Sequence, residues 1–516
     1  MIVMTSEELM SDTSELIAGR LGLNFPKERW SDLERGLSSA AKELGFKNAE
    51  ATAHWFLTNH INKNQIEILA SHLTIGETYF FRDIKYFEIL EEEILPKLIS
   101  SRHKSDKRIR IWSAGCSSGE EPYSLAMLLN KMIPDLKEWN ITILATDINP
   151  KFLKKANEGI YTEWSFRNTP TWAKEKFFIA ESEKRFKILP SIKKMVNISY
   201  LNLAEDNYPS LISNTNAMDI VFCRNVLMYF VSELANKVVL NLHKSLIEGG
   251  WLIVNPAETS FIHRSQFNQI NYDNAIMYQR DNGKNEPSIE IKSPDIQFET
   301  KEELFDSKFG IKTSKNEKII LSEEIHRSLG ESAPLGIEYL NEEKAKKDDG
   351  LDLFSVACDL YKTGLYEEAG KKLLELFSKD QFDSKTTALL ARIYANKGKL
   401  EEAFNWCKRA ITSDKLNPAH YYLQATILQE LGNKKEAISF LKQTLYLDHN
   451  FVMAYLTLGN LTSNNHQPHE SKKYYQNALS ILNTYAPDEI LPYSEGITAG
   501  RLSEIIGSSN YLESLK

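Results

Sequence analysis

Cysteine is scarce and scattered in this chain of 516 residues. No Cys-x-x-Cys pair occurs and no histidine cluster accompanies the four cysteines, which are Cys116, Cys223, Cys358 and Cys407. Paired cysteines form the disulfide frameworks of secreted domains, and closely spaced cysteines and histidines hold zinc. We therefore expect neither a disulfide framework nor a metal site.

Long apolar runs and an excess of positive charge are also missing. The longest apolar stretch, residues 220–230, contains Arg224 and Asn225 and is much shorter than the roughly 20 apolar residues of a membrane span. The first twenty residues are acidic where a secretory signal would have a basic start. A net charge of -8 provides no general attraction to nucleic acid or anionic lipid. We expect a cytoplasmic protein without membrane insertion or a nucleic-acid partner.

Two patterns of apolar residues divide the first half of the chain. Between Trp30 and Leu44 the apolar residues have helical spacing, and Gly45 is a plausible helix end. After Arg108, short β-rich runs alternate with helix-like segments; these runs are residues 109–112, 141–145, 196–203, 219–223 and 251–254. This alternation is typical of a doubly wound, mostly parallel α/β sheet. We predict an all-helical domain over residues 1–90 and a Rossmann-like domain over residues 91–282.

The second half of the chain repeats itself. Residues 283–349 are polar and charge-rich and are predicted to be a linker. Beyond them, three sets of residues keep a spacing of 34: Ala357, Ala391, Ala425 and Gly459; Gly364, Gly398, Gly432 and His466; Ala369, Ala403, Ala437 and Ser471. These blocks resemble tetratricopeptide repeats, which stack helix pairs into an α-solenoid. We expect such a domain over residues 350–483, with a degenerate last repeat and a tail over residues 484–516; the alternative is an unrelated helical bundle.

A loop rich in small residues follows the first β-rich run. Residues 113–119 read Ser-Ala-Gly-Cys-Ser-Ser-Gly, and Pro122 suits the first turn of a helix that starts there. Small residues let a ligand lie against the backbone, so the segment is a candidate cofactor cradle, with a purely structural turn as the alternative. The next β-rich run ends at Asp147, an acidic residue placed to accept hydrogen bonds from a ribose diol. The alternative is that Asp147 caps the helix beginning near Pro150.

Four ordered motifs resemble the chemotaxis receptor methyltransferase family (CheR type). They are Thr-Tyr-Phe-Phe-Arg at residues 78–82, Gly-Glu-Glu-Pro-Tyr-Ser at 119–124, Ala-Thr-Asp-Ile at 145–148 and Phe-Cys-Arg-Asn-Val-Leu-Met-Tyr-Phe at 222–230. The resemblance covers about residues 15 to 280. It implies a helical N-terminal domain and a methyltransferase domain with a small inserted β-subdomain. It also implies S-adenosylmethionine as the cofactor, S-adenosylhomocysteine as the product, and receptor glutamate side chains as the substrate.

The resemblance also implies which residues form the site. The implied cofactor contacts are Thr78, Arg82, Glu121, Asp147, Asn202, Leu203, Arg224 and Asn225, and the implied catalytic residues are Arg82 and Tyr229. A glutamate carboxylate is already anionic at neutral pH, so methyl transfer to it requires in-line positioning but no general base. A cation and a hydroxyl group would orient that carboxylate. The alternatives are that Arg82 is an ordinary surface ion-pair residue and that Tyr229 packs in the core beside Phe230.

The second predicted helix departs from the resemblance, because it is only weakly basic. Lys27, Arg29, Arg35 and Lys42 are interleaved with acidic residues, so docking to an acidic receptor segment can differ. The repeats are expected to bind a further protein partner. Methylation of another protein or of a small carboxylate, and a catalytically silent adaptor that senses the cofactor, remain alternative functions. Nucleic-acid methylation is disfavoured because no basic stripe is interleaved with aromatic residues.

Overall fold

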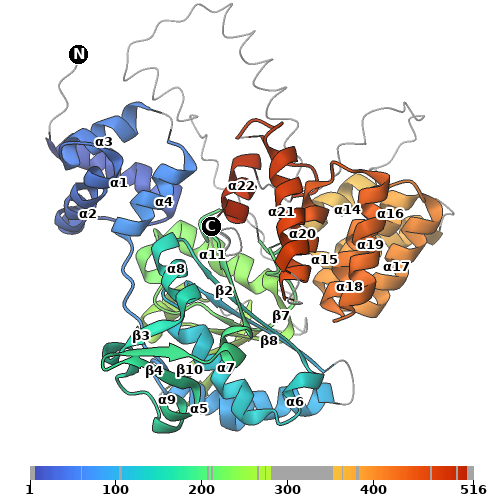
Figure 1. Ribbon diagram of the computed structural model, residues 1–516, viewed down its shortest axis with the longest axis horizontal. Coiled ribbons are helices and arrows are strands. Elements are labelled where there is room, and N and C mark those ends of the chain that lie inside the picture. Colours follow the sequence, from blue (N-terminus) through green and yellow to red (C-terminus); the bar gives the residue numbers. More distant parts are fainter. Residues whose placement is uncertain are drawn as a thin grey trace, which may run out of the picture. The chain divides into compact units, whose positions relative to one another are not determined.

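The computed structural model describes most of the chain (Figure 1). The described residues are 6–59, 61–103, 107–205, 208–210, 213–263, 266–273, 275–280, 353–362, 364–378, 383–464, 468–487, 489–494 and 498–507. The predicted linker over residues 283–349 and the repeat position His466 lie outside them.

The N-terminal part is a bundle of helices, as predicted. It comprises α1 (Ser6–Leu21), η1 (Lys27–Arg29), α2 (Trp30–Leu44), α3 (Ala49–Thr58) and α4 (Lys63–Leu73). The apolar face of α2 is buried at Leu33, Leu37 and Ala40, and the helix ends at Gly45 in a left-handed conformation (φ 81°) that suits glycine. The helical spacing and the helix end read from the sequence are both confirmed.

A helical run leads from this bundle into the sheet domain. It consists of α5 (Lys85–Ile89), a π-helical turn η2 (Leu90–Ile94) and α6 (Leu95–His103). Phe87, Leu90 and Leu95 are buried in the core of the sheet domain, whereas the core of the bundle ends at Leu73. The change of core therefore precedes residue 90, and the boundary expected there falls inside a helical run.

A seven-stranded mixed sheet forms the centre of the next domain. Its strands are β1 (Arg108–Ala114), β2 (Asn140–Asp147), β6 (Val196–Tyr200), β7 (Met218–Phe222), β8 (Leu246–Ile253), β9 (Phe267–Tyr272) and β10 (Ala275–Arg280). Their order is β6-β2-β1-β7-β8-β10-β9. The first five pair in parallel, and β10 pairs antiparallel with both β8 and β9. The five β-rich runs of the sequence are thus confirmed as parallel strands.

Helices connect these parallel strands. They are α7 (Glu120–Met132), η3 (Leu136–Glu138), α8 (Pro150–Glu158), η5 (Leu227–Tyr229) and α11 (Ser232–Ser245), and η6 (Pro256–Phe261) leads from β8 to β9. All residues of β1 and of β7 are buried, as expected for central strands covered on both faces.

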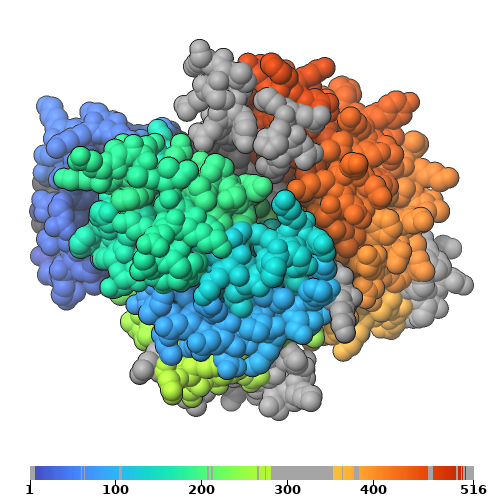
Figure 2. All heavy atoms as spheres, turned by 60° about the horizontal axis from the view of Figure 1, so that its bottom comes forward, coloured from blue at the N-terminus to red at the C-terminus, as the bar shows by residue number. Residues whose placement is uncertain are grey.

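A small three-stranded sheet is inserted between β2 and β6. Its strands are β3 (Ile160–Thr162), β4 (Phe178–Ser182) and β5 (Arg185–Ile188), in the antiparallel order β3-β5-β4. The short helices η4 (Glu163–Phe166), α9 (Thr171–Phe177) and α10 (Pro190–Lys193) flank it. Phe80 packs edge-on against Tyr161 and Phe178 and so joins this subdomain to the preceding segment. Figure 2 shows the subdomain, coloured teal to green, at the surface of the molecule.

The C-terminal part consists of antiparallel helix pairs. The pairs are α14 (Leu353–Lys362) with α15 (Tyr366–Ser378), α16 (Ser384–Asn396) with α17 (Leu400–Ser413), and α18 (Pro418–Glu430) with α19 (Lys434–Leu447). A second compact unit contains α20 (Val452–Asn464), α21 (Pro468–Leu482) and α22 (Ala499–Gly507). The alanines of the 34-residue period are buried at helix crossings, and Gly364, Gly398 and Gly432 end helices with positive φ. The repeat architecture is confirmed.

Within the first compact unit, the repeats contact the amino ends of the parallel strands. Arg110 of β1 is almost fully buried and forms an ion pair with Glu430 of α18. The side-chain amide of Asn140, at the start of β2, donates to the carbonyl of Glu430 at 2.7 Å. These contacts lie at the opposite ends of the strands from Asp147 and Phe222.

In the described part of the chain, no helix is both long enough and apolar enough to span a membrane.

Candidate active site

One cavity lies where the parallel strands β1, β2, β6 and β7 end. It encloses about 1080 Å³, counting the part open to solvent. All nine residues predicted from the sequence line it: Thr78, Arg82, Glu121, Asp147, Asn202, Leu203, Arg224, Asn225 and Tyr229. Carboxyl ends of parallel strands are the usual ligand-binding edge of such sheets.

The loop after β1 forms the floor of this cavity. Gly115 has φ 81°, and a Cβ atom there would lie 2.3 Å from Cγ2 of Val226. The N–H groups of Gly115 and Cys116 donate to the carbonyl of Thr146 at 2.8 and 2.9 Å, which ties the loop to the end of β2. The backbone is therefore exposed to a ligand at a place where a side chain does not fit, as the small-residue motif predicts.

Asp147 is a half-buried acceptor at the end of β2. Its Oδ2 accepts the N–H of Ser117 at 2.8 Å, and its Oδ1 accepts the N–H of Asn149 at 2.8 Å. Burial raises the pKa of Asp147 from 3.8 to about 6, and these N–H groups oppose the rise. The cap of α8 is Asn149, whose side chain accepts from Lys151 and Phe152. The alternative that Asp147 caps this helix is therefore wrong.

Glu121 lies in the first turn of α7 and points toward β1. Its Oε1 accepts the hydroxyl of Ser113 at 2.8 Å, and its Oε2 lies 3.3 Å from Nη1 of Arg224. Burial raises the pKa of Glu121, and the charge of Arg224 opposes this rise most strongly. Glu121 therefore lies at the cavity wall beside one cation, Arg224, and its oxygens can also accept from a second positive group.

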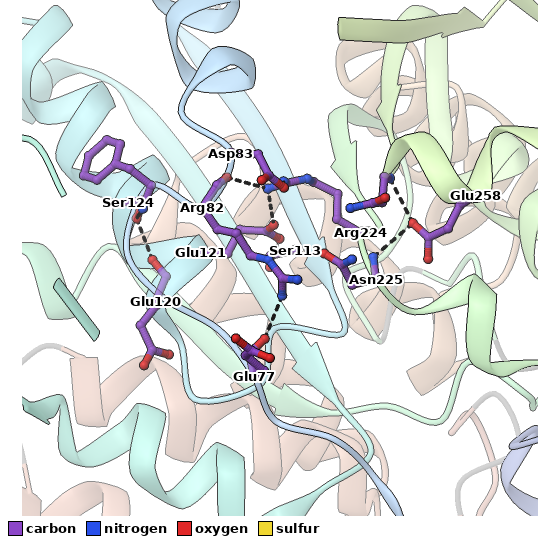
Figure 3. Close-up of polar contacts among 12 residues, drawn as sticks. Glu77, Arg82, Asp83, Ser113, Glu120, Glu121, Ser124, Arg224, Asn225 and Glu258 are labelled. Atoms are coloured by element: carbon purple, nitrogen blue, oxygen red, sulfur yellow. Dashed lines mark hydrogen bonds and ion pairs between the residues drawn. The ribbon is translucent and has the colours of Figure 1, made fainter. Parts of the chain in front are cut away.

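Arg82 is carried by a strained segment. Its neighbours Phe81 and Asp83 have φ angles of 54° and 55°, a region that residues other than glycine rarely adopt. The N–H of Phe81 donates to the hydroxyl of Ser124 at 2.9 Å, while Arg224 donates to the carbonyl of Arg82 at 3.0 Å and pairs with Asp83 (Figure 3). The backbone around Arg82 is thus fixed from two sides.

The guanidinium of Arg82 itself is directed at the cavity rather than at an acidic side chain. Its Nη1 donates to the carbonyl of Glu77 at 2.7 Å, and its Cζ lies 5.8 Å from the ring centre of Tyr79. Among the ion pairs of the described residues, none includes Arg82. This arrangement does not support the surface ion-pair alternative.

Tyr229 stands where the helical bundle meets the sheet domain. Its carbonyl accepts the N–H of Asn24 at 2.7 Å, and Leu23 and Phe230 form an isolated antiparallel bridge. The guanidinium of Arg29 lies 6.0 Å from the ring centre of Tyr229. Tyr229 is half-buried, so it is part of the cavity wall rather than of a closed core.

Asn202 and Leu203 follow β6 and line the cavity, Asn202 with a polar amide and Leu203 with an apolar side chain. The amide of Asn202 is already engaged: Nδ2 donates to the carbonyl of Arg20 at 3.1 Å, and Oδ1 accepts the N–H of Ala204 at 3.0 Å. Leu203 is buried and supplies an apolar surface. In this geometry Asn202 fixes the loop after β6.

Three further residues of the site were not predicted from the sequence. A Cβ atom at Gly76 would lie 2.2 Å from the ring of Phe152, so glycine lets that ring line the cavity. Glu258 of η6 is fully buried and accepts hydrogen bonds from the segment that carries Asn225. The pattern Asn-Pro-Ala-Glu at residues 255–258 is a helix-capping signal that marks Glu258 as a candidate.

The cysteines near the site do not act as nucleophiles. Cys116 and Cys223 are both buried, and burial raises the pKa of each thiol well above its usual value. In the described part of the chain, no group of three or more His, Cys, Asp or Glu side chains is placed to hold a metal ion.

Comparisons with known proteins match both halves of the chain. Residues 76–276 match the model of the CheR methyltransferase, SAM binding domain, and residues 388–415 and 421–451 match the tetratricopeptide repeat. A chemotaxis protein methyltransferase of Borreliella burgdorferi is 35% identical over 260 residues, which cover 50% of this chain and 90% of that protein. Chemotaxis protein methyltransferase 2 of Vibrio cholerae is 34% identical over 204 residues, covering 40% of this chain and 69% of that protein.

Proposed function

The chain belongs to the CheR methyltransferase family, and on that premise we propose that it esterifies glutamate side chains of chemoreceptors. It is a methyltransferase that uses S-adenosylmethionine. One observation supports the proposal most directly: Asp147, Glu121 and Arg82 line the same cavity at the carboxyl ends of the parallel strands.

The residues present fit this cofactor. Two glycines, Gly76 and Gly115, stand where a Cβ atom would collide with a cavity-lining side chain, so the cradle depends on their lack of side chains. Two half-buried carboxylates offer acceptors: Asp147 for ribose hydroxyl groups and Glu121 for the ammonium of the methionine part. Leu203 and Phe152 provide apolar surface for a base.

The acceptor carboxylate needs orientation more than activation. When bound, S-adenosylmethionine supplies an electrophilic methyl group on a sulfonium. A glutamate side chain is already ionised at neutral pH, so no group in the cavity has to remove a proton. We assign to Arg82 the task of turning the carboxylate by a charge-assisted hydrogen bond and to Tyr229, which also lines the cavity, a second contact. The bundle residues Leu23 and Phe25, which line the cavity, exclude water.

The remaining assignments are proposals as well. The substrate is a methyl-accepting chemoreceptor, as the names of the relatives suggest, and the enzyme works in the cytoplasm. The repeats over residues 350–483 bind a further protein partner. The proposed domain limits are residues 1–90, 91–282, 283–349, 350–483 and 484–516, although the helix α22 lies within the last of these.

Mass spectrometry tests the reaction. The full chain is incubated with methyl-labelled S-adenosylmethionine and the cytoplasmic part of a chemoreceptor from the same organism, and the receptor is digested. We expect methyl groups on glutamate side chains that are released by mild base, and labelling that is roughly a hundredfold slower with a variant that carries Arg82→Ala. A base-stable N-methyl product would contradict the proposal.

A further inference from the structure

Glu258 is a fully buried carboxylate at the edge of the cofactor site. Among the ion pairs of the described residues, none includes it. Four backbone N–H groups surround it instead: Oε2 accepts from Asn225 at 3.0 Å and Asn255 at 2.9 Å, and Oε1 accepts from Val226 at 2.7 Å and Met228 at 3.4 Å. Burying a charge is strongly unfavourable without such compensation, so these bonds determine where the carboxylate and its donors lie.

Three of these four donors belong to one loop, residues 224–229. This loop carries Arg224, Asn225 and Tyr229, which are three of the nine predicted site residues. Asn225 has a φ angle of 59°, an unfavourable conformation for a residue other than glycine, and its own N–H and that of Val226 both donate to Glu258. Figure 3 shows Glu258 on one side of the loop and the Arg224 side chain on the other.

The loop in turn fixes the segment around Arg82. Arg224 donates to the carbonyl of Arg82, pairs with Asp83 and lies 3.3 Å from Glu121. Val226 occupies the space beside Gly115 in the floor of the cavity. Any movement of the loop backbone therefore displaces both the cavity floor and the backbone of the proposed catalytic arginine.

We propose that Glu258 is a positioning residue: it holds the 224–229 loop in its strained conformation, so that the S-adenosylmethionine site exists before the cofactor binds. The inference rests on the proposed function of this site. A capping role alone explains only the bond to Asn255, since Asn225, Val226 and Met228 lie about thirty residues earlier in the chain and outside η6.

The variant Glu258→Gln tests this role with little change of shape. In glutamine, an NH₂ group replaces one of the two carboxylate oxygens and cannot accept a hydrogen bond. The two backbone N–H groups that face it therefore lose their acceptor, and the loop relaxes. We expect the Kd for S-adenosylmethionine, measured by calorimetry on the full chain, to rise about tenfold or more. Glu258→Asp, which keeps the charge on a shorter side chain, should show a smaller increase.

Asp219→Asn is the matched control. Asp219 is also a buried carboxylate that accepts a backbone N–H, from Arg110 at 2.8 Å, but it lies at the amino end of β7, away from the loop. This variant should lower thermal stability while leaving the Kd unchanged. Unchanged affinity in Glu258→Gln, or an equal loss of affinity in Asp219→Asn, would overturn the inference.

Two further results separate the possible failures. If the unaltered chain does not bind S-adenosylmethionine, the proposed function fails; if it binds and Glu258→Gln binds equally well, only the inference fails. Should Glu258→Gln not fold, hydrogen exchange on the unaltered chain decides. Without cofactor, the amides of Asn225 and Val226 should exchange at least about a hundredfold more slowly than in an unfolded chain, and exchange at the unfolded rate would overturn the inference.

Discussion

At the scale of single residues, a comparison of Arg82 with the neighbouring Arg167 separates a catalytic role of Arg82 from its contribution to local packing. Both Arg82 and Arg167 stack on Tyr79 and contact Glu77, but only Arg82 lines the cavity. Arg82→Ala should lower kcat for receptor methylation by roughly a hundredfold, because the acceptor carboxylate loses its orienting donor. Arg167→Ala should change kcat by less than about twofold. Steady-state assays with both variants test this, and equal effects would refute the assignment.

The raised pKa of Asp147 predicts how the affinity for the cofactor depends on pH. Its pKa is raised by burial to about 6, so the free protein takes up a proton at this carboxyl as the pH falls through that value. The protonated form has lost the negative acceptor for ribose hydroxyl groups. The Kd for S-adenosylmethionine should be constant above pH 7 and rise by up to about tenfold per unit below pH 6.

The variant Asp147→Asn provides the control for this titration. It should bind weakly at every pH and lose the pH dependence below 6, because no proton is taken up at that position. Calorimetry between pH 5 and pH 8 distinguishes the two behaviours. A pH dependence that survives in the variant would assign the titration to another group.

At the scale of elements, the helical bundle provides a matched pair of glycines. Gly36 lies in α2 against α4, where a Cβ atom would be 2.4 Å from Cδ2 of Leu73, whereas a Cβ atom at Gly19 in α1 would meet nothing within 4 Å. Gly36→Ala should destabilise the protein by roughly 1–3 kcal/mol through overpacking. Gly19→Ala should stabilise it by up to about 1 kcal/mol through helix propensity. Denaturant unfolding monitored by circular dichroism measures both, and equal signs would contradict the α2–α4 packing.

At the scale of the whole molecule, residues that stabilise the fold and residues that line the cofactor cavity lie at opposite ends of the parallel strands. The ion pair of Arg110 with Glu430 joins the repeats to the amino ends of the strands, while the cavity lies at their carboxyl ends. Glu430→Gln leaves a buried arginine without its anion and should lower stability by roughly 3 kcal/mol, with an unchanged Kd for S-adenosylmethionine. Glu436→Gln, at an exposed position of the same repeat, should leave both unchanged. Thermal unfolding and calorimetry on the full chain test this separation.

The helices, the parallel strands and the repeats were predictable because their residues follow local rules. The apolar spacing of α2, its glycine stop and the 34-residue period each reflect a face that must be buried in any arrangement. The hairpin β9–β10 was not predicted, since β9 reads Phe-Asn-Gln-Ile-Asn-Tyr and only its pairing with β10 makes it a strand. The change of core before residue 90 was likewise invisible, because helix α5 looks the same whichever core it enters.

The sequence by itself determined the fold class and the chemical types of the nine proposed site residues. Four ordered motifs carry seven of them, and Asn202 and Leu203 lie at the end of a β-rich run. Only the tertiary structure decided how those residues are held. Asn149 rather than Asp147 caps α8, Gly76 makes room for Phe152, and Glu258 fixes the loop of Asn225 from about thirty residues further along the chain. Burial, steric contact and hydrogen bonding between distant segments are properties of the folded chain, so no local pattern contains them.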